Sequence, residues 1–143
     1  MHQLRNVIKL FNIFFYIFLM SWDIVIFSSK QNITSIEEID EELFIPIDFN
    51  SILEKHFTDI IIDGNHREIK GNNYSINYFV DSGPVSNTLM NLYGEAALFE
   101  LIAIAKKYNL QIFDMALGEI IDLENPAKNG YKNFQDYLKQ ILG

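Results

Sequence analysis

The stretch HREIKGNNYSINYFV, residues 66–80, decides the fold class of this chain. In its second half one set of side chains alternates with another: Tyr74, Ile76, Tyr78 and Val80 against Ser75, Asn77 and Phe79. A period of two residues is typical of a strand, whose successive side chains point to opposite faces. Gly71, Asn72 and Asn73 form a turn signal between the two halves. The stretch therefore predicts a β-hairpin, and with it a mainly antiparallel sheet.

Other segments around the hairpin have the composition of strands. Residues 22–27 are rich in β-branched and aromatic side chains and end at two serines, which predicts a largely buried strand in the middle of the sheet. Shorter strands are expected at 60–62, 86–93, 111–115 and 119–123.

Helical periodicity marks four further segments. Residues 95–108 are apolar nearly all round, with an acid at the start and two lysines at the end, which predicts a helix buried on more than one side. Asp48 is expected to cap an amphipathic helix that runs to Phe57. Ser35 and Glu38 have capping-box spacing before a short acidic helical turn. A C-terminal amphipathic helix is expected from about Tyr131.

These elements predict one α+β domain over residues 21–143. It would consist of a mainly antiparallel sheet with a buried central helix, a second amphipathic helix and a C-terminal helix. The chain is 49% apolar and 14% aromatic, which is enough for a substantial core. It has no cysteine, so disulfides, thiolate zinc sites and a cysteine nucleophile are excluded.

Residues 1–20 form a hydrophobic N-terminal extension that differs from the rest of the chain. Arg5 and Lys9 precede an apolar run from Leu10 to Met20, as in a signal peptide, but no small-x-small cleavage site follows. The run is shorter than the roughly 20 apolar residues that span a bilayer.

Three interpretations of this extension stay open. The complete strand predicted at 22–27 favours Met20 as the true start and a cytoplasmic protein. The alternatives are a membrane anchor over residues 4–20, holding an accessory protein at the membrane, and a signal peptide. Deleting Met1 to Leu19 and testing the solubility of the remainder separates the first two.

Charge is the strongest indication of function. Nine Lys and Arg against nineteen Asp and Glu give residues 21–143 a formal charge of −10. Such a surface disfavours nucleic acid and anionic lipid, because binding to phosphates requires Lys and Arg. A basic protein partner is favoured instead.

The acids are densest at Glu37, Glu38, Asp40, Glu41 and Glu42. Like charges at this spacing repel one another, and a cationic partner would offset the repulsion. We therefore expect these five residues to bind the partner. The alternative is a solvated helix face with no partner.

Only one group of residues suggests catalysis or metal binding. His66 and Glu68 would share one face of a strand, with Asp63 nearby, but a metal site would need further ligands. No phosphate-binding glycine motif is present. We expect no enzyme activity, no metal and no cofactor, and keep a small enzyme or metal protein around His66 and Glu68 as the less favoured alternative.

Three stretches of the chain resemble small uncharacterised acidic bacterial proteins of the immunity-protein type, which act against polymorphic toxins: residues 21–27, residues 92–95 and residues 122–131 without 127 and 128. The resemblance concerns overall type and carries over no functional residue. It implies a non-catalytic inhibitor that occludes a toxin domain. A basic toxin would be attracted by the acidic surface, since opposite charges steer association.

Overall fold

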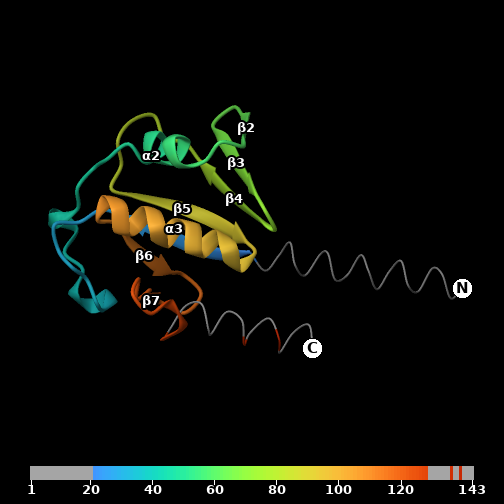
Figure 1. Ribbon diagram of the computed structural model, residues 1–143. Helices are drawn as coiled ribbons and strands as arrows, with labels where there is room; N and C mark the ends of the chain where they lie inside the picture. The colour runs from blue at the N-terminus through green and yellow to red at the C-terminus, as the bar shows by residue number, and fades with distance from the viewer. Residues whose placement is uncertain (1–20, 129–135, 137–138, 140–143) are drawn as a thin grey trace, which may run out of the picture.

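Seven strands form a single antiparallel sheet in the computed structural model, which describes residues 21–128, 136 and 139 (Figure 1). The predicted α+β class is confirmed, as is the antiparallel sheet with its hairpin. The strands are β1 (Trp22–Phe27), β2 (Ile60–Asp63), β3 (His66–Gly71), β4 (Tyr74–Phe79), β5 (Asn87–Tyr93), β6 (Gln111–Asp114) and β7 (Glu119–Ile120).

The strand order is β2-β3-β4-β5-β1-β6-β7. Four strands that follow one another in sequence, β2 to β5, form a meander. The first strand, β1, then lies between β5 and β6 and pairs antiparallel with both. It is an interior strand, as its apolar sequence predicts.

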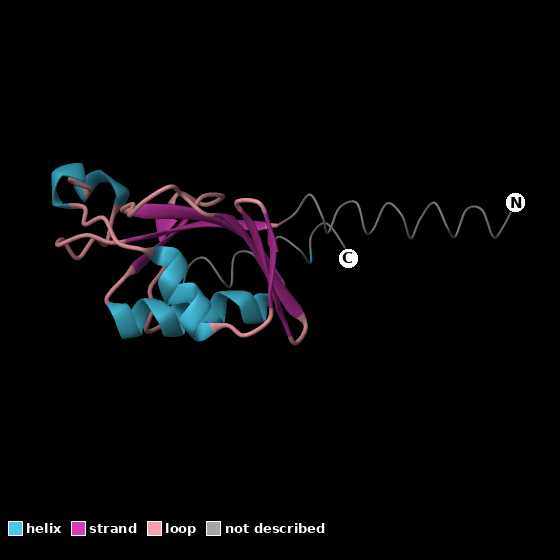
Figure 2. Ribbon diagram, turned by 90° about the horizontal axis from the view of Figure 1, so that it is seen from above, coloured by secondary structure: helices cyan, strands magenta, loops and turns pink. Residues whose placement is uncertain are grey.

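Two α-helices lie on the same side of the sheet, α2 (Phe49–His56) and α3 (Glu95–Tyr108), as Figure 2 shows. Asp48 caps α2, because its side chain accepts a hydrogen bond from the backbone N–H of Ser51. The hydroxyl of Tyr78 on β4 donates to the side chain of Asn50 at 2.9 Å and so ties the sheet to α2.

Helix α3 connects β5 to β6 and contacts β4, β5 and β6. Gly94 precedes it at φ +90°, and a side chain there would meet the backbone oxygen of Asn73 at 2.6 Å. The close approach of these two chain segments therefore requires glycine. Asn109 ends the helix in the left-handed conformation.

The prediction that α3 is buried on more than one side does not hold along its outer stripe. Its buried residues form one broad face on the side of the sheet: Ala97, Leu98, Leu101, Ile102, Ile104 and Ala105. The opposite stripe is exposed and includes Phe99 and Ala103. Apolar composition overstated the burial because alanine and one phenylalanine occupy positions that face away from the sheet.

Two other elements differ from expectation. Residues 36–43 form two separate 3-10 turns, η1 (Ile36–Glu38) and η2 (Glu41–Leu43), in place of the single acidic helical turn expected there. The strand expected at 119–123 is shortened to the two residues of β7.

Within residues 21–128, no helix is long and apolar enough to span a bilayer. The predicted C-terminal helix from Tyr131 and the extension 1–20 fall outside the described residues.

Candidate functional site

The five acids singled out by the sequence lie together in the segment that connects β1 to α2. Glu37 and Glu38 belong to η1, Asp40 lies between the turns, and Glu41 and Glu42 belong to η2. All five are exposed. We call residues 37–42 the acidic segment. Figure 2 shows its two turns projecting beyond one end of the sheet.

Gln31 holds the two turns together. Its side-chain amide donates to the backbone oxygen of Glu38 at 2.6 Å, and its side-chain oxygen accepts from the backbone N–H of Asp40 at 3.1 Å. The Asp40 carboxylate in turn accepts from the backbone N–H of Glu42 at 3.0 Å. The bend between η1 and η2 is therefore built from side-chain contacts to backbone.

The residues that precede the acidic segment are joined to the sheet. The Gln111 side chain on β6 donates to the backbone oxygen of Gln31 and accepts from the backbone N–H of Ile33, both at 2.8 Å. At the other end of the segment, the backbone N–H of Lys30 donates to Leu43 at 2.8 Å. The acidic segment is thus a structured projection whose backbone has a defined conformation.

The predicted capping box at Ser35 is not formed. The Ser35 hydroxyl makes no cap hydrogen bond and instead donates to the Glu37 carboxylate at 3.0 Å. Because η1 spans only three residues, the N–H groups that a capping box would satisfy are not aligned as in an α-helix.

The ion pairs within the described residues leave the acidic segment out. They join Lys70 to Glu68 and Lys106 to Glu124, while His56 and Glu100 form a hydrogen bond at 2.9 Å. Basic residues are also rare near the segment in sequence, since Lys30 is the one basic residue between positions 28 and 54. At physiological ionic strength the field of the segment extends about 8 Å, which is far enough to act on an approaching cationic surface.

In the alternative site around His66, His66 and Glu68 contact different neighbours. His66 and Glu68 share one face of the sheet, as predicted, and Asp63 lies on the same face because it pairs with His66 across the β2–β3 hairpin. However, the His66 ring lies 2.9 Å from the Asn77 side-chain oxygen, and Glu68 pairs with Lys70 at 3.2 Å. Across residues 21–128, 136 and 139, no group of three or more His, Asp or Glu side chains is arranged to hold a metal.

A hollow of about 440 Å³ lies where the segment after β7 meets the segment after β1. Both apolar and polar residues line it, among them Ile33, Gln111 and Leu123. Neither Glu68 nor His66 lines it, and the Gln111 side chain is already hydrogen-bonded to the backbone of Gln31.

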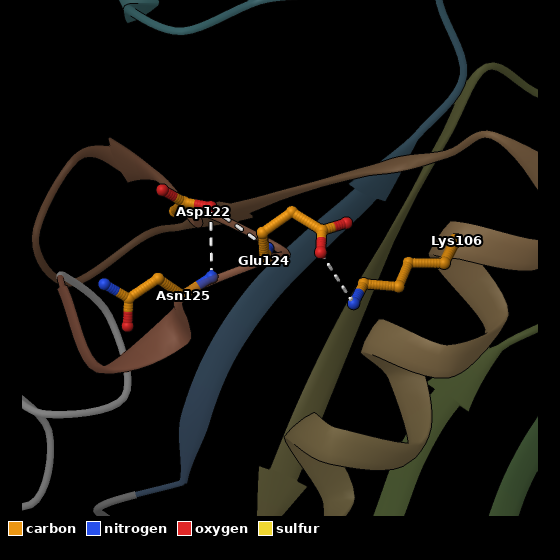
Figure 3. A network of polar contacts seen from close by, with 4 residues as sticks. All are labelled: Lys106, Asp122, Glu124 and Asn125. Atoms are coloured by element: carbon orange, nitrogen blue, oxygen red, sulfur yellow. Dashed lines mark hydrogen bonds and ion pairs between the residues drawn. The ribbon is translucent and has the colours of Figure 1, made fainter.

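The stretch 122–125, which contributed to the family resemblance, has a structural role beside this hollow (Figure 3). The Asp122 carboxylate accepts from the backbone N–H groups of Glu124 at 3.0 Å and Asn125 at 3.1 Å. The Glu124 carboxylate reaches Lys106 of α3 at 3.4 Å. These contacts shape the turn after β7 and join it to the end of the helix.

Sequence reasoning did not single out Gln31 and Gln111. Their contribution depends on the contact between β6 and the loop after β1, which lie 78 residues or more apart in the chain. Neither a glutamine in a loop, such as Gln31, nor one at the start of a strand, such as Gln111, carries a local signal for such a contact.

Comparison with family models, with curated proteins and with solved structures found no match to this chain.

Proposed function

We propose that this protein is a non-catalytic binding protein, an immunity-type inhibitor that neutralises a basic toxin through its acidic surface. The acidic segment would lie over the cationic site of the partner. No catalytic residue, metal or cofactor is needed, because the inhibitor acts by occlusion.

One observation carries the proposal. Glu37, Glu38, Asp40, Glu41 and Glu42 are exposed, without an ion-pair partner among the described residues, on a projection that Gln31 and Gln111 hold in place. Solvated charges on an unstructured loop would lose conformational entropy on binding, whereas a projection with defined geometry has already lost much of it. The arrangement suits recognition of a complementary surface.

The alternative of an enzyme or metal protein around His66 and Glu68 lacks comparable support. Both side chains are engaged by different neighbours, and neither lines the hollow beside β7. A membrane-anchored accessory protein depends on residues 4–20, which the structure does not describe.

The test compares two variants of equal net charge. In the first, Glu37→Lys, Glu38→Lys, Glu41→Lys and Glu42→Lys reverse the acidic segment. In the second, Glu54→Lys, Asp81→Lys, Glu119→Lys and Glu124→Lys reverse four acids elsewhere. The toxin is taken from the neighbouring gene and its cleavage or killing activity is measured with each inhibitor. Loss of protection in the first variant alone supports the proposal, and equal protection by both variants contradicts it.

A further inference from the structure

The outer edge of β2 offers backbone groups for strand addition. β2 is the first strand of the sheet order and pairs on one side with β3 (Figure 1). The backbone N–H of Lys70 donates to Asp59 at 2.9 Å, so Asp59, Ile61 and Asp63 direct their backbone groups toward β3. Because the direction alternates, the N–H and C=O groups of Ile60 and Ile62 point away from the sheet.

The β2 edge exposes isoleucine side chains and lacks several features that usually prevent another strand from pairing with a sheet edge. The exposed fraction is 47% for Ile61 and 62% for Ile62. Edge strands commonly carry lysine, proline or a bulge that prevents another strand from pairing. β2 has none of these within Ile60–Asp63, whereas the other edge strand, β7, is only two residues long.

Two exposed acids flank the isoleucines and restrict what can pair with them. Asp59 and Asp63 lie two residues on either side of Ile61, so all three side chains project from the same face. In a second copy paired antiparallel along the whole edge, Asp59 of each chain would face Asp63 of the other. Like charges directly opposite each other on paired strands are destabilising, which disfavours self-association.

We propose that β2 accepts an extended strand of a basic partner, with a lysine or arginine opposite each aspartate and three apolar residues between them. The added strand would hydrogen-bond to Ile60 and Ile62 and cover Ile61 and Ile62. The basic nature of this partner rests on the proposed function. The β2 edge is a contact separate from the acidic segment and supplies main-chain pairing that the segment does not.

A short peptide tests the pairing directly. The probe has lysine at its first and fifth positions and valine at the three between, with polar flanks, and the control peptide has glutamate in place of both lysines. Each is titrated to millimolar concentration into the full ¹⁵N-labelled chain while backbone amide shifts and hydrogen exchange are recorded.

Ile62→Pro is the blocking variant. Ile62 directs its N–H outward, so proline removes the donor needed by an added strand without removing a β2–β3 hydrogen bond. Ile62→Ala retains that donor and is the matched control. The amide spectrum of each variant without peptide shows whether the native sheet has formed.

Charge exchange provides a second, independent variant. Asp59→Lys with Asp63→Lys should reverse the preference, so that the glutamate peptide binds better than the lysine peptide. Glu119→Lys with Glu124→Lys changes the net charge equally at the opposite edge and should leave the preference unchanged.

The expected result is that the lysine peptide shifts and protects the amides of Ile60 and Ile62, and that Ile62→Pro weakens its binding by about tenfold or more. Unshifted β2 amides, shifts confined to residues 37–42, or equal binding to Ile62→Pro would overturn the assignment, as would a dimer that Ile62→Pro dissociates. If toxin inhibition survives Ile62→Pro but not reversal of the acidic segment, the edge proposal fails and the proposed function stands. The converse result leaves the edge proposal standing and removes the acidic segment as the inhibitory surface.

Discussion

The indole N–H of Trp22 donates to the Asp114 carboxylate at 3.0 Å, joining two residues that are 92 positions apart. Both side chains are about 1% exposed. The other carboxylate oxygen of Asp114 accepts from the backbone N–H groups of Ala116 and Leu117. One buried acid therefore joins the start of β1 to the turn between β6 and β7. A buried carboxylate is costly without such partners, so each donor matters to folding.

A double-mutant cycle should show that Trp22 and Asp114 are energetically coupled. Trp22→Phe leaves the Asp114 oxygen without its donor, and Asp114→Ala leaves the indole N–H without its acceptor. We expect a coupling energy of about 1–3 kcal/mol in a double-mutant cycle measured by urea unfolding. The exposed hydrogen bond between Asn50 and Glu54, within α2, is the control pair and should give about 0.5 kcal/mol or less. Additive effects of Trp22→Phe and Asp114→Ala would contradict the prediction.

Leu101 should be among the most sensitive positions of α3, because it is 0% exposed and lies on the face that meets the sheet. Leu101→Ala is expected to lower the free energy of unfolding by about 2–5 kcal/mol, through lost burial and the cavity that remains. Ile102→Ala should fall in the same range, since Ile102 is also buried. The measurement is the urea midpoint together with its slope.

The same helix supplies the control for this prediction. Lys106 pairs with Glu124 at 3.4 Å, but the side chains are 45% and 84% exposed. Such surface pairs contribute about 0–1 kcal/mol. Lys106→Ala should therefore change stability far less than Leu101→Ala. A loss below about 1 kcal/mol for both Leu101→Ala and Ile102→Ala would show that this helix does not anchor the core.

The local sequence was sufficient to predict an element when several signals within that element agreed. Helix 95–108 was predicted with the bounds observed, because its acid, its apolar periodicity, its lysines and the preceding Gly94 all indicate the same ends. The hairpin 66–80 was equally well defined by alternation and turn residues. The signals that place these elements in the chain come from residues that are near neighbours in sequence.

Features that depend on distant neighbours could not be predicted. Asp114 was placed in a strand, but nothing near it indicates its contact with Trp22. The acidic run was located correctly as exposed sequence, yet its two 3-10 turns depend on Gln31 and Gln111. The position of β2 at the sheet edge follows from strand order, which alternation along a single strand does not specify.

Stability should fall at high pH through Tyr78. Burial raises the pKa of this phenol from 10.0 to about 12, the negative charge of Glu54 acts in the same direction, and Arg67 opposes them. Below pH 10 the phenol is protonated in both folded and unfolded chains, so its contribution to stability is fully present. Between pH 10 and about 12 the unfolded chain loses this proton first, and the contribution declines by roughly 1.4 kcal/mol for each pH unit.

Tyr78→Phe isolates this effect. The phenylalanine variant lacks the ionisable group, so the stability difference between the parent and Tyr78→Phe should shrink as pH rises from 10 to 12. Burial also raises the pKa of Tyr74, which is present in the parent and in Tyr78→Phe. Some loss of stability at high pH is therefore expected in both. Urea titrations at several pH values provide the measurement. A difference that stays constant to pH 12 would show that the phenol of Tyr78 titrates normally.

The acidic segment should act mainly on the rate of association. Its carboxylates are exposed and have no ion-pair partner among the described residues, so they attract a cationic surface before contact and bury few atoms after it. Reversing Glu37, Glu38, Glu41 and Glu42 to lysine should slow association with a basic toxin by on the order of tenfold or more at low salt, with a smaller change in dissociation. Because salt screens exposed charges, the difference from the parent should narrow as ionic strength rises.

This rate prediction requires that the reversed variant remains folded. Gln31 contacts backbone atoms of the segment, and those contacts do not depend on the glutamate side chains. The free energy of unfolding should therefore change by only about 0.5 kcal/mol, as for most exposed substitutions. Association and dissociation are measured by surface plasmon resonance at two salt concentrations, beside the variant with four acids reversed elsewhere. An effect that is confined to dissociation, or that is equal in the two variants, would mean that the segment contributes no directed attraction of its own.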